Sequence, residues 1–138
     1  MPEQAKSAIR PRPLSPHLQI YRWPVTMATS IVHRATGMAL SAGTLVVAWW
    51  LIAIVMGPTQ YDLFSTVMRS PLGQLVLLGF VWSLSYHLLN GIRHLAWDVG
   101  YGFDKHTASR TGVLVLTLSI FVAIAIFAYA YAAKGVHL

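Results

Sequence analysis

The 138-residue sequence contains no cysteine, which excludes disulfides, zinc–thiolate sites, cysteine-ligated iron–sulfur clusters and thiol nucleophiles from this chain. Charged residues are also scarce, at 10% of the chain, whereas an average soluble protein has about 25%. Only four residues are acidic. Any metal held by this chain must therefore depend on histidine or on oxygen ligands.

Apolar residues are in excess and make up 56% of the chain. A domain of this length keeps much of its surface exposed, so it cannot hide that much apolar surface from water. The composition therefore predicts a membrane protein. The formal net charge of +6 would suggest a nucleic-acid partner in a soluble protein, but here the placement of the cations bears on membrane topology and no nucleic acid is expected.

Three uncharged stretches are each long enough to cross a bilayer as a helix. Each has about 23 residues, or roughly 34 Å of helix at 1.5 Å per residue. The stretches are Ala35–Gly57, Ser70–Ile92 and Thr111–Ala133. We therefore expect an all-α membrane protein with spans at about residues 29–57, 70–98 and 110–133, all within one transmembrane domain over residues 29–138.

Most cations lie before the first span or around the loop that follows the second. These residues are Lys6, Arg10, Arg12, Arg22, Arg34, Arg93, Lys105 and Arg110, and only Arg69 and Lys134 lie on the other side. The positive-inside rule then predicts a cytoplasmic N-terminus and a periplasmic C-terminus. Residues 1–28 are rich in proline, which predicts an extended cytoplasmic arm and interfacial segment suited to docking a soluble partner.

Polar and small residues recur on one face of the first span: Ser30, Arg34, Gly37, Ser41 and Thr44. For Gly37, Ser41 and Thr44 we expect a seam of helix packing, because small residues mark such seams. Arg34 alone could extend to the lipid headgroups. With Ser30 and His33 beside it, however, it predicts a group of hydrogen-bond donors suited to a carbonyl or carboxylate ligand.

The second span carries a more informative face, made of Ser83, His87, Asn90, Gly91, His94 and Asp98. His87 lies within the hydrocarbon, where ionisable residues are rare and costly. It could simply satisfy its ring nitrogens on neighbouring helices. A neutral imidazole flanked by Ser83 and Gly91 in an apolar cleft is also what haem iron requires as an axial ligand. No second histidine is expected at the same depth, so a sixth ligand should come from another polypeptide.

Three other functions compete with this interpretation. A free-standing cytochrome b should have its own pair of facing histidines at equal depth, which is not expected here. A proton-coupled transporter would usually need a carboxylate inside a span, and Asp62, Asp98 and Asp104 lie in loops or at a helix end. A structural membrane anchor without haem is the third alternative.

Three segments resemble a known family. Residues 12–17 (RPLSPH) with 30–37 (SIVHRATG), and residues 87–98 (HLLNGIRHLAWD), are similar to the two signatures of the large cytochrome b membrane-anchor subunit of succinate dehydrogenase, in respiratory complex II. The order, the spacing and the three spans also match. The resemblance thus covers essentially the whole chain.

The resemblance implies a subunit of succinate:ubiquinone oxidoreductase in the tricarboxylic acid cycle, with no catalytic activity when isolated. Its partners would be a flavoprotein, an iron–sulfur subunit and a second anchor subunit, with which it would share haem b in a helical bundle. The location implied is the bacterial inner membrane, with the mitochondrial inner membrane as the alternative.

The resemblance also implies roles for individual residues. His87 would be the haem iron ligand, and the ubiquinone site would include Ser30, Ile31 and Arg34. Further residues would lie near the haem propionates (His33, Arg34, His94) or at a possible subunit interface (Arg93, Asp98).

Overall fold

The computed structural model describes Pro16 and residues 20–134. This part of the chain is helical and contains no strand; its helices are α2 (Val25–Met56), α3 (Pro58–Arg69), α4 (Pro71–Asp98) and α5 (Lys105–Lys134). Helices α2, α4 and α5 are long and apolar enough to cross a membrane, so the predicted all-α protein with three spans is confirmed. Most of the predicted N-terminal arm, including His17 and the cations at 6, 10 and 12, lies outside the described residues.

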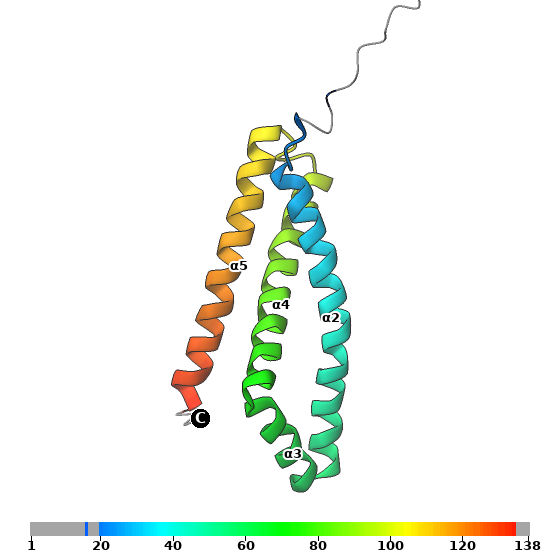
Figure 1. Ribbon diagram of the computed structural model, residues 1–138, viewed down its shortest axis with the longest axis vertical. Helices are drawn as coiled ribbons and strands as arrows, with labels where there is room; N and C mark the ends of the chain where they lie inside the picture. The colour runs from blue at the N-terminus through cyan, green and yellow to red at the C-terminus, as the bar shows by residue number, and fades with distance from the viewer. Residues whose placement is uncertain (1–15, 17–19, 135–138) are drawn as a thin grey trace, which may run out of the picture.

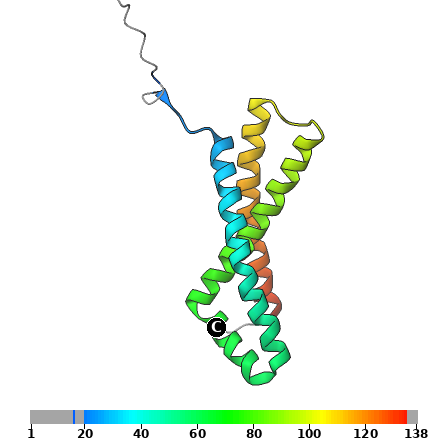
Figure 2. The same cartoon turned by 90° about the vertical axis from the view of Figure 1, so that its right-hand side faces the viewer.

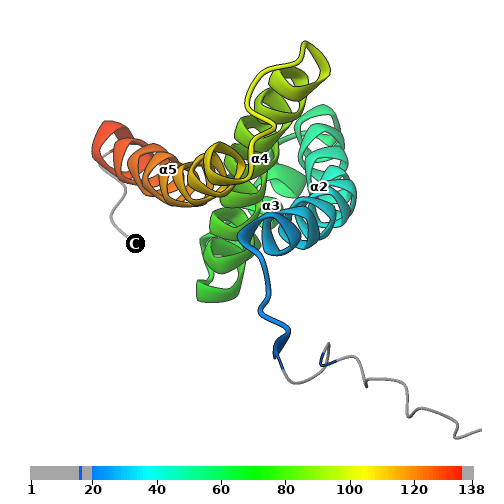
Figure 3. The ribbon, with the colours of Figure 1, turned by 90° about the horizontal axis from the view of Figure 1, so that it is seen from above.

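Helix α4 lies between α2 and α5 and contacts both of them (Figures 1 and 3). The start of α2, the end of α4 and the start of α5 lie at the same end of the molecule, which we call the N-terminal end (Figure 1). Helix α3 joins α2 to α4 at the opposite end, which we call the α3 end (Figure 2). The molecule therefore has two distinct ends. The contact between α2 and α4 runs from one end to the other, and we call it the α2–α4 seam.

Helix α2 has 32 residues, a rise of about 48 Å, which exceeds the roughly 30 Å of bilayer hydrocarbon. It begins at Val25, earlier than the predicted residue 29, directly after Pro24, whose extended backbone (φ −72°, ψ 146°) forms the N-cap. It ends before Gly57, whose φ of 100° an L side chain rarely adopts. At this length, α2 must tilt or project beyond the hydrocarbon.

Helix α3 occupies a segment for which the sequence predicted only a connection between spans. Pro58 occupies the first helical turn, where its missing N–H is not needed. Phe64 and Met68 are half-buried against the other helices, whereas Asp62 and Arg69 are exposed. With only 12 residues and one polar side, α3 is too short to span the bilayer and suits its surface.

The link from α4 to α5 is held by side-chain hydrogen bonds. Trp97 Nε1 donates to the carbonyl of Gly102, 3.1 Å away, and Gly102 has a φ of 80°. Asp104 Oδ1 accepts from the backbone N–H groups of His106 and Thr107, each at 3.0 Å, and so caps α5. Hydrogen bonds from Thr107, and then from His106, hold the pKa of the Asp104 carboxyl below its usual value. The start of α5 is thereby fixed against the end of α4.

Small and polar side chains dominate the interior, while large apolar side chains face outward. The buried residues include Thr29, Thr36, Ala53, Ser83, Ser85, Asn90, Ala108, Ser119 and Ala123. Lipid is as apolar as leucine, so membrane helices associate through close packing and hydrogen bonds between small residues. This pattern is typical of a membrane-embedded bundle.

Only part of the predicted packing seam on α2 packs within this chain. Gly37 does pack against α4, but Ser41 and Thr44 are exposed and their hydroxyls donate to carbonyls of their own helix. The packing face carries Thr29 and Thr36 instead, both buried and two helical turns apart. Helix α2 is therefore rotated so that part of the polar face points out of this chain.

Candidate functional site

Three histidines gather on the seam between α2 and α4. The ring centroids of His33 and His87 are 3.9 Å apart with an interplanar angle of 13°, and the ring of His94 lies 5.1 Å from that of His33. The expectation that no other histidine shares the depth of His87 is therefore wrong. Helix α2 begins at Val25, before the predicted start of the span, and runs antiparallel to α4. His33, about two turns into α2, therefore lies beside His87.

The stacked arrangement still leaves this chain with one suitable axial ligand. The lone pairs of imidazole nitrogens lie in the ring plane, so two parallel rings in contact cannot direct their lone pairs at an atom between them. Among the described residues, no three His, Asp or Glu side chains are close enough to hold a metal ion together. A metal here would need most of its ligands from elsewhere, as an iron in a macrocycle does.

His87 is in contact with two further residues of α2. Its Nδ1 lies 3.4 Å from the hydroxyl oxygen of Thr36, and a Cβ added to Gly37 would lie 3.2 Å from its Cε1. No hydrogen bond joins Nε2 of His87 to another described residue. The ring is thus held on one side and has one nitrogen left for a ligand, so the site fits an axial haem ligand.

A polar pocket of about 320 Å³ lies next to this cluster, at the N-terminal end. It is lined by Thr26, Met27, Thr29, Ser30, Asn90, Arg93, His94 and Trp97. Of the predicted quinone-site residues, only Ser30 lines this pocket. Arg34 is exposed but reaches Ser30, its guanidinium lying 3.3 Å from Ser30 Oγ, whereas Ile31 is 41% exposed and makes no part of the lining.

Arg93, in the lining of the polar pocket, is buried and links three helices. Its guanidinium donates to Thr29 Oγ1 of α2 (3.4 Å) and to Thr111 Oγ1 (3.1 Å) and the Ala108 carbonyl (2.7 Å) of α5. It also lies over the Trp97 ring, 4.1 Å from the centroid. The side chain is 7% exposed, so its N–H groups form hydrogen bonds within this chain and not with a partner. Of the two possible interface residues, Asp98 alone is exposed.

The Arg93 network also fixes the proton on His94. Arg93 donates to Oδ1 of Asn90 at 3.1 Å, which identifies the other amide atom of Asn90 as Nδ2. That Nδ2 lies 3.3 Å from Nε2 of His94, so Nε2 must be the acceptor. His94 therefore carries its proton on Nδ1, which can donate to a ligand in the pocket.

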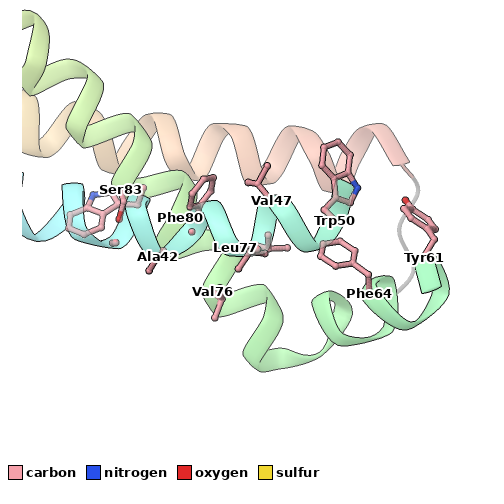
Figure 4. Close-up of a pocket in the computed structure, with 14 residues that line it drawn as sticks. Ala42, Val47, Trp50, Tyr61, Phe64, Val76, Leu77, Phe80 and Ser83 are labelled. Carbon is pink, nitrogen blue, oxygen red and sulfur yellow. The ribbon is translucent and has the colours of Figure 1, made fainter. Parts of the chain in front are cut away.

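A larger and more apolar cleft, of about 780 Å³, opens toward the α3 end. Its wall includes Ser83, one turn from His87, and Phe80 on α4, facing Ala42 and Val47 on α2 (Figure 4). Trp50 of α2 and Phe64 of α3 lie at its other end (Figure 4). The volume falls in the range of about 300–1,000 Å³ found for small-molecule sites. The seam thus combines an apolar space with polar groups at one end.

Two buried polar atoms have no hydrogen-bond partner among the described residues: Nδ1 of His33 and Nε1 of Trp82. Such atoms are uncommon, because each costs about 1–3 kcal/mol when left unpaired. His33 Nδ1 belongs to the histidine cluster, and Trp82 lines the apolar cleft. Both atoms therefore lie where a bound group could supply the missing partner.

Sequence reasoning missed the contributions of Thr29, Thr36 and the buried Arg93. A signal was present for the threonines, because Thr29 and Thr36 are seven residues apart and so share a helical face. No such signal exists for Arg93. A cation near a helix end is usually solvated, and only the approach of α5 buries it.

The described residues thus define a three-span membrane protein with a histidine cluster and a buried polar network inside its bundle. Residues 8–126 match the family described as "Succinate dehydrogenase/Fumarate reductase transmembrane subunit", and the chain belongs to this family. The resemblance drawn from the three sequence segments is confirmed.

Individual relatives agree with this assignment. The chain is 49% identical to the succinate dehydrogenase cytochrome b556 subunit of Paracoccus denitrificans over 100 residues, covering 72% of this chain and 77% of that one. It is 41% identical to the cytochrome b556 subunit of Rickettsia typhi over 106 residues, covering 76% and 82%. It is also 43% identical to the mitochondrial cytochrome b560 subunit of Sus scrofa over 110 residues, covering 76% of this chain and 63% of the pig protein.

Proposed function

We propose that the chain anchors succinate:ubiquinone oxidoreductase in the membrane, supplies His87 to haem b and forms part of the ubiquinone site. The observation that carries the proposal is the seating of His87 on α2, with Nδ1 beside Thr36 and Nε2 not engaged by another described residue. Membership of the family and the cytochrome b names of the relatives support it. In this role the chain has no catalytic activity of its own and acts as one subunit of the oxidoreductase in the tricarboxylic acid cycle.

The haem would be shared with a second anchor subunit, which contributes the other axial ligand. When bound, haem b stores and passes on one electron at a time. His87 would hold the iron through Nε2, and the unpaired Nδ1 of His33, the Nδ1–H of His94 and the exposed Arg34 would suit the two propionates. The apolar cleft beside Ser83 would offer space lined mostly by apolar side chains for part of the macrocycle.

Ubiquinone would bind at the N-terminal end, with Ser30 and Arg34 donating to a carbonyl oxygen and Ile31 offering an apolar contact. Reduction of a quinone to a quinol adds two electrons and two protons, so negative charge develops on the carbonyl oxygens. The guanidinium of Arg34 already lies 3.3 Å from the hydroxyl of Ser30, so both donors can converge on one oxygen. Water at the membrane surface supplies the protons.

The exposed polar face of α2 supports a partner inside the membrane. Arg34, Ser41 and Thr44 point out of this chain, and lipid contact with such groups is unfavourable. A second anchor subunit would cover them, and the iron–sulfur and flavoprotein subunits would dock at the N-terminal end, which lies on the cytoplasmic side. The complex belongs in the bacterial inner membrane, with the mitochondrial inner membrane as the alternative.

The quinone assignment is tested by measuring two activities in the purified complex. Arg34→Ala removes a fixed donor and should lower succinate-to-ubiquinone electron transfer about 100-fold, while succinate oxidation with a soluble dye is retained. Ser30→Ala should act in the same direction. Arg69→Ala, at the α3 end, is the matched control and should leave both activities unchanged. Equal loss of both activities in Arg34→Ala would mean failed assembly and would contradict a specific role at the quinone.

A further inference from the structure

The imidazole of His87 is enclosed on one side by three residues from a single stretch of α2. His33 stacks on its face, Gly37 lies against Cε1, and the hydroxyl of Thr36 lies 3.4 Å from Nδ1. Thr36 is 2% exposed, so water does not compete for its hydroxyl. None of these three contacts forms a hydrogen bond with Nε2.

The hydrogen bonds of Thr36 determine which nitrogen of His87 carries the proton. Thr36 Oγ1 lies 2.9 Å from each of the carbonyl oxygens of Val32 and His33. A hydroxyl has one proton, and carbonyl oxygens can only accept, so the Thr36 proton is directed at these two carbonyls. The contact with His87 is then a hydrogen bond only if Nδ1–H donates to Oγ1. This tautomer leaves the lone pair on Nε2, where iron needs it.

We propose that Thr36 is the positioning residue of His87: its hydroxyl, held by the backbone of α2, sets the tautomer and the orientation of the haem ligand. The inference rests on the proposed role of His87 as ligand. Hydrogen bonds from the second nitrogen of a ligating histidine fix its ring and raise its basicity, and losing such a partner typically lowers metal affinity about 10–100-fold. Because the Thr36 contact is long, we expect the lower end of this range.

Gly37 completes the arrangement by leaving room for the ring. A Cβ at this position would lie 3.2 Å from Cε1 and 3.7 Å from Nδ1 of His87. Contact at 3.2 Å is too close to be tolerated without a shift, so a larger residue would push the imidazole away from the Thr36 hydroxyl. The ring position therefore depends on both neighbours: Gly37 admits the ring and Thr36 orients it.

The test compares Thr36→Val, which keeps the volume and removes the hydroxyl, with Thr36→Ser, which keeps the hydroxyl. Thr117→Val is the matched control, because Thr117 also lies in a membrane-spanning helix, but it is exposed and its hydroxyl donates to the Val113 carbonyl of its own helix. The complex is purified with all its subunits, and two properties are measured: the haem midpoint potential and the rate of haem loss to a haem-scavenging apoprotein. Dye-linked succinate oxidation reports assembly.

We expect Thr36→Val to assemble, to bind haem about tenfold more weakly and to show a higher midpoint potential, because a less basic imidazole stabilises ferric iron less. Thr36→Ser should restore both values, and Thr117→Val should match the unsubstituted complex. The proposal is overturned if Thr36→Val leaves both properties unchanged or if Thr36→Ser behaves like Thr36→Val. It is also overturned if neither Thr36→Val nor the smaller Thr36→Ala assembles, because Thr36 would then serve helix packing.

A further variant separates failure of this inference from failure of the proposed function. His87→Ala should remove the haem altogether. If His87→Ala loses haem and Thr36→Val changes nothing, the ligand assignment stands and only the role of Thr36 is rejected. If His87→Ala keeps its haem unaltered, both are rejected.

Discussion

The two ends of the α2–α4 seam are built on different principles. At the N-terminal end, Arg93, Asn90 and Thr29 join the helices through directional hydrogen bonds. At the α3 end, the same two helices are separated by an apolar cleft of about 780 Å³ (Figure 4). Hydrogen bonds fix groups in particular orientations, whereas apolar contacts in lipid do not. The polar end is thus suited to positioning a reacting group and the apolar end to accommodating a bulky one.

The largest effect on stability is expected from Arg93→Met. The substitution keeps the length of the side chain but removes its bonds to Thr29, Asn90, Thr111 and the Ala108 carbonyl. Hydrogen bonds between membrane helices contribute about 0.6 kcal/mol each, and acceptors left unpaired add to the loss. We expect a loss of about 2–4 kcal/mol, measured by thermal or denaturant unfolding of the purified complex in detergent. An unchanged unfolding midpoint would show that Arg93 does not hold the N-terminal end together.

Two glycine substitutions compare the rigidity of the ends directly. A Cβ on Gly112, at the N-terminal end, would lie 3.2 Å from Cγ2 of Thr29 and 3.3 Å from Cγ1 of Val25. Both atoms are close to the backbone of α2, so they have little freedom to move away. A Cβ on Gly43 would collide with the ring of Phe80, but that ring lines the cleft and has space to move. We expect Gly112→Ala to destabilise by about 1–3 kcal/mol and Gly43→Ala by less than about 1 kcal/mol.

The measurement for this pair is the unfolding midpoint of each variant relative to the unsubstituted complex. A larger loss for Gly43→Ala than for Gly112→Ala would reverse the comparison. It would mean that the α3 end is the more tightly packed of the two.

The smallest effect is expected at Asp104, at the exposed start of α5. Its carboxylate caps the helix. The hydrogen bonds that lower its pKa stabilise the folded state, and this stabilisation is fully present at pH values above the ordinary pKa of 3.8. This contribution is lost as the pH falls through the lower pKa of the folded state. Asp104→Asn should keep the cap and lose the pH dependence, whereas Asp104→Ala should lower the unfolding midpoint slightly at neutral pH. A similar midpoint for Asp104→Ala and the unsubstituted complex would show that the cap is dispensable.

Much of the architecture could be predicted from local signals. Apolar runs long enough for the bilayer gave the three spans, and the helical period placed His87, Asn90 and His94 on one face of α4. Helix α3 could not be predicted, because twelve mostly polar residues match neither a span nor a buried helix. Its position depends on how the chain folds back between two spans.

Positions that depend on how two helices sit relative to each other could not be predicted either. Whether His33 lies beside His87 depends on where α2 begins and on the position of α2 along the axis of α4. The periodicity of a single helix predicts neither the start of α2 nor that position. The direction of the α2 polar face was likewise unknown until the rotation of α2 placed Thr36 inward and Ser41 outward. The identity of the residues in the cluster was available from the sequence, but the contacts between them were not.

The most direct test of the account is the reduced-minus-oxidised absorption spectrum of the purified complex carrying His87→Ala. His106→Ala is the matched control, because His106 is an exposed histidine in the first turn of α5. The account predicts that His87→Ala loses the b-type absorption band while the other subunits still copurify, and that His106→Ala keeps the band at full intensity. A b-type band of unchanged position and intensity in His87→Ala would contradict it.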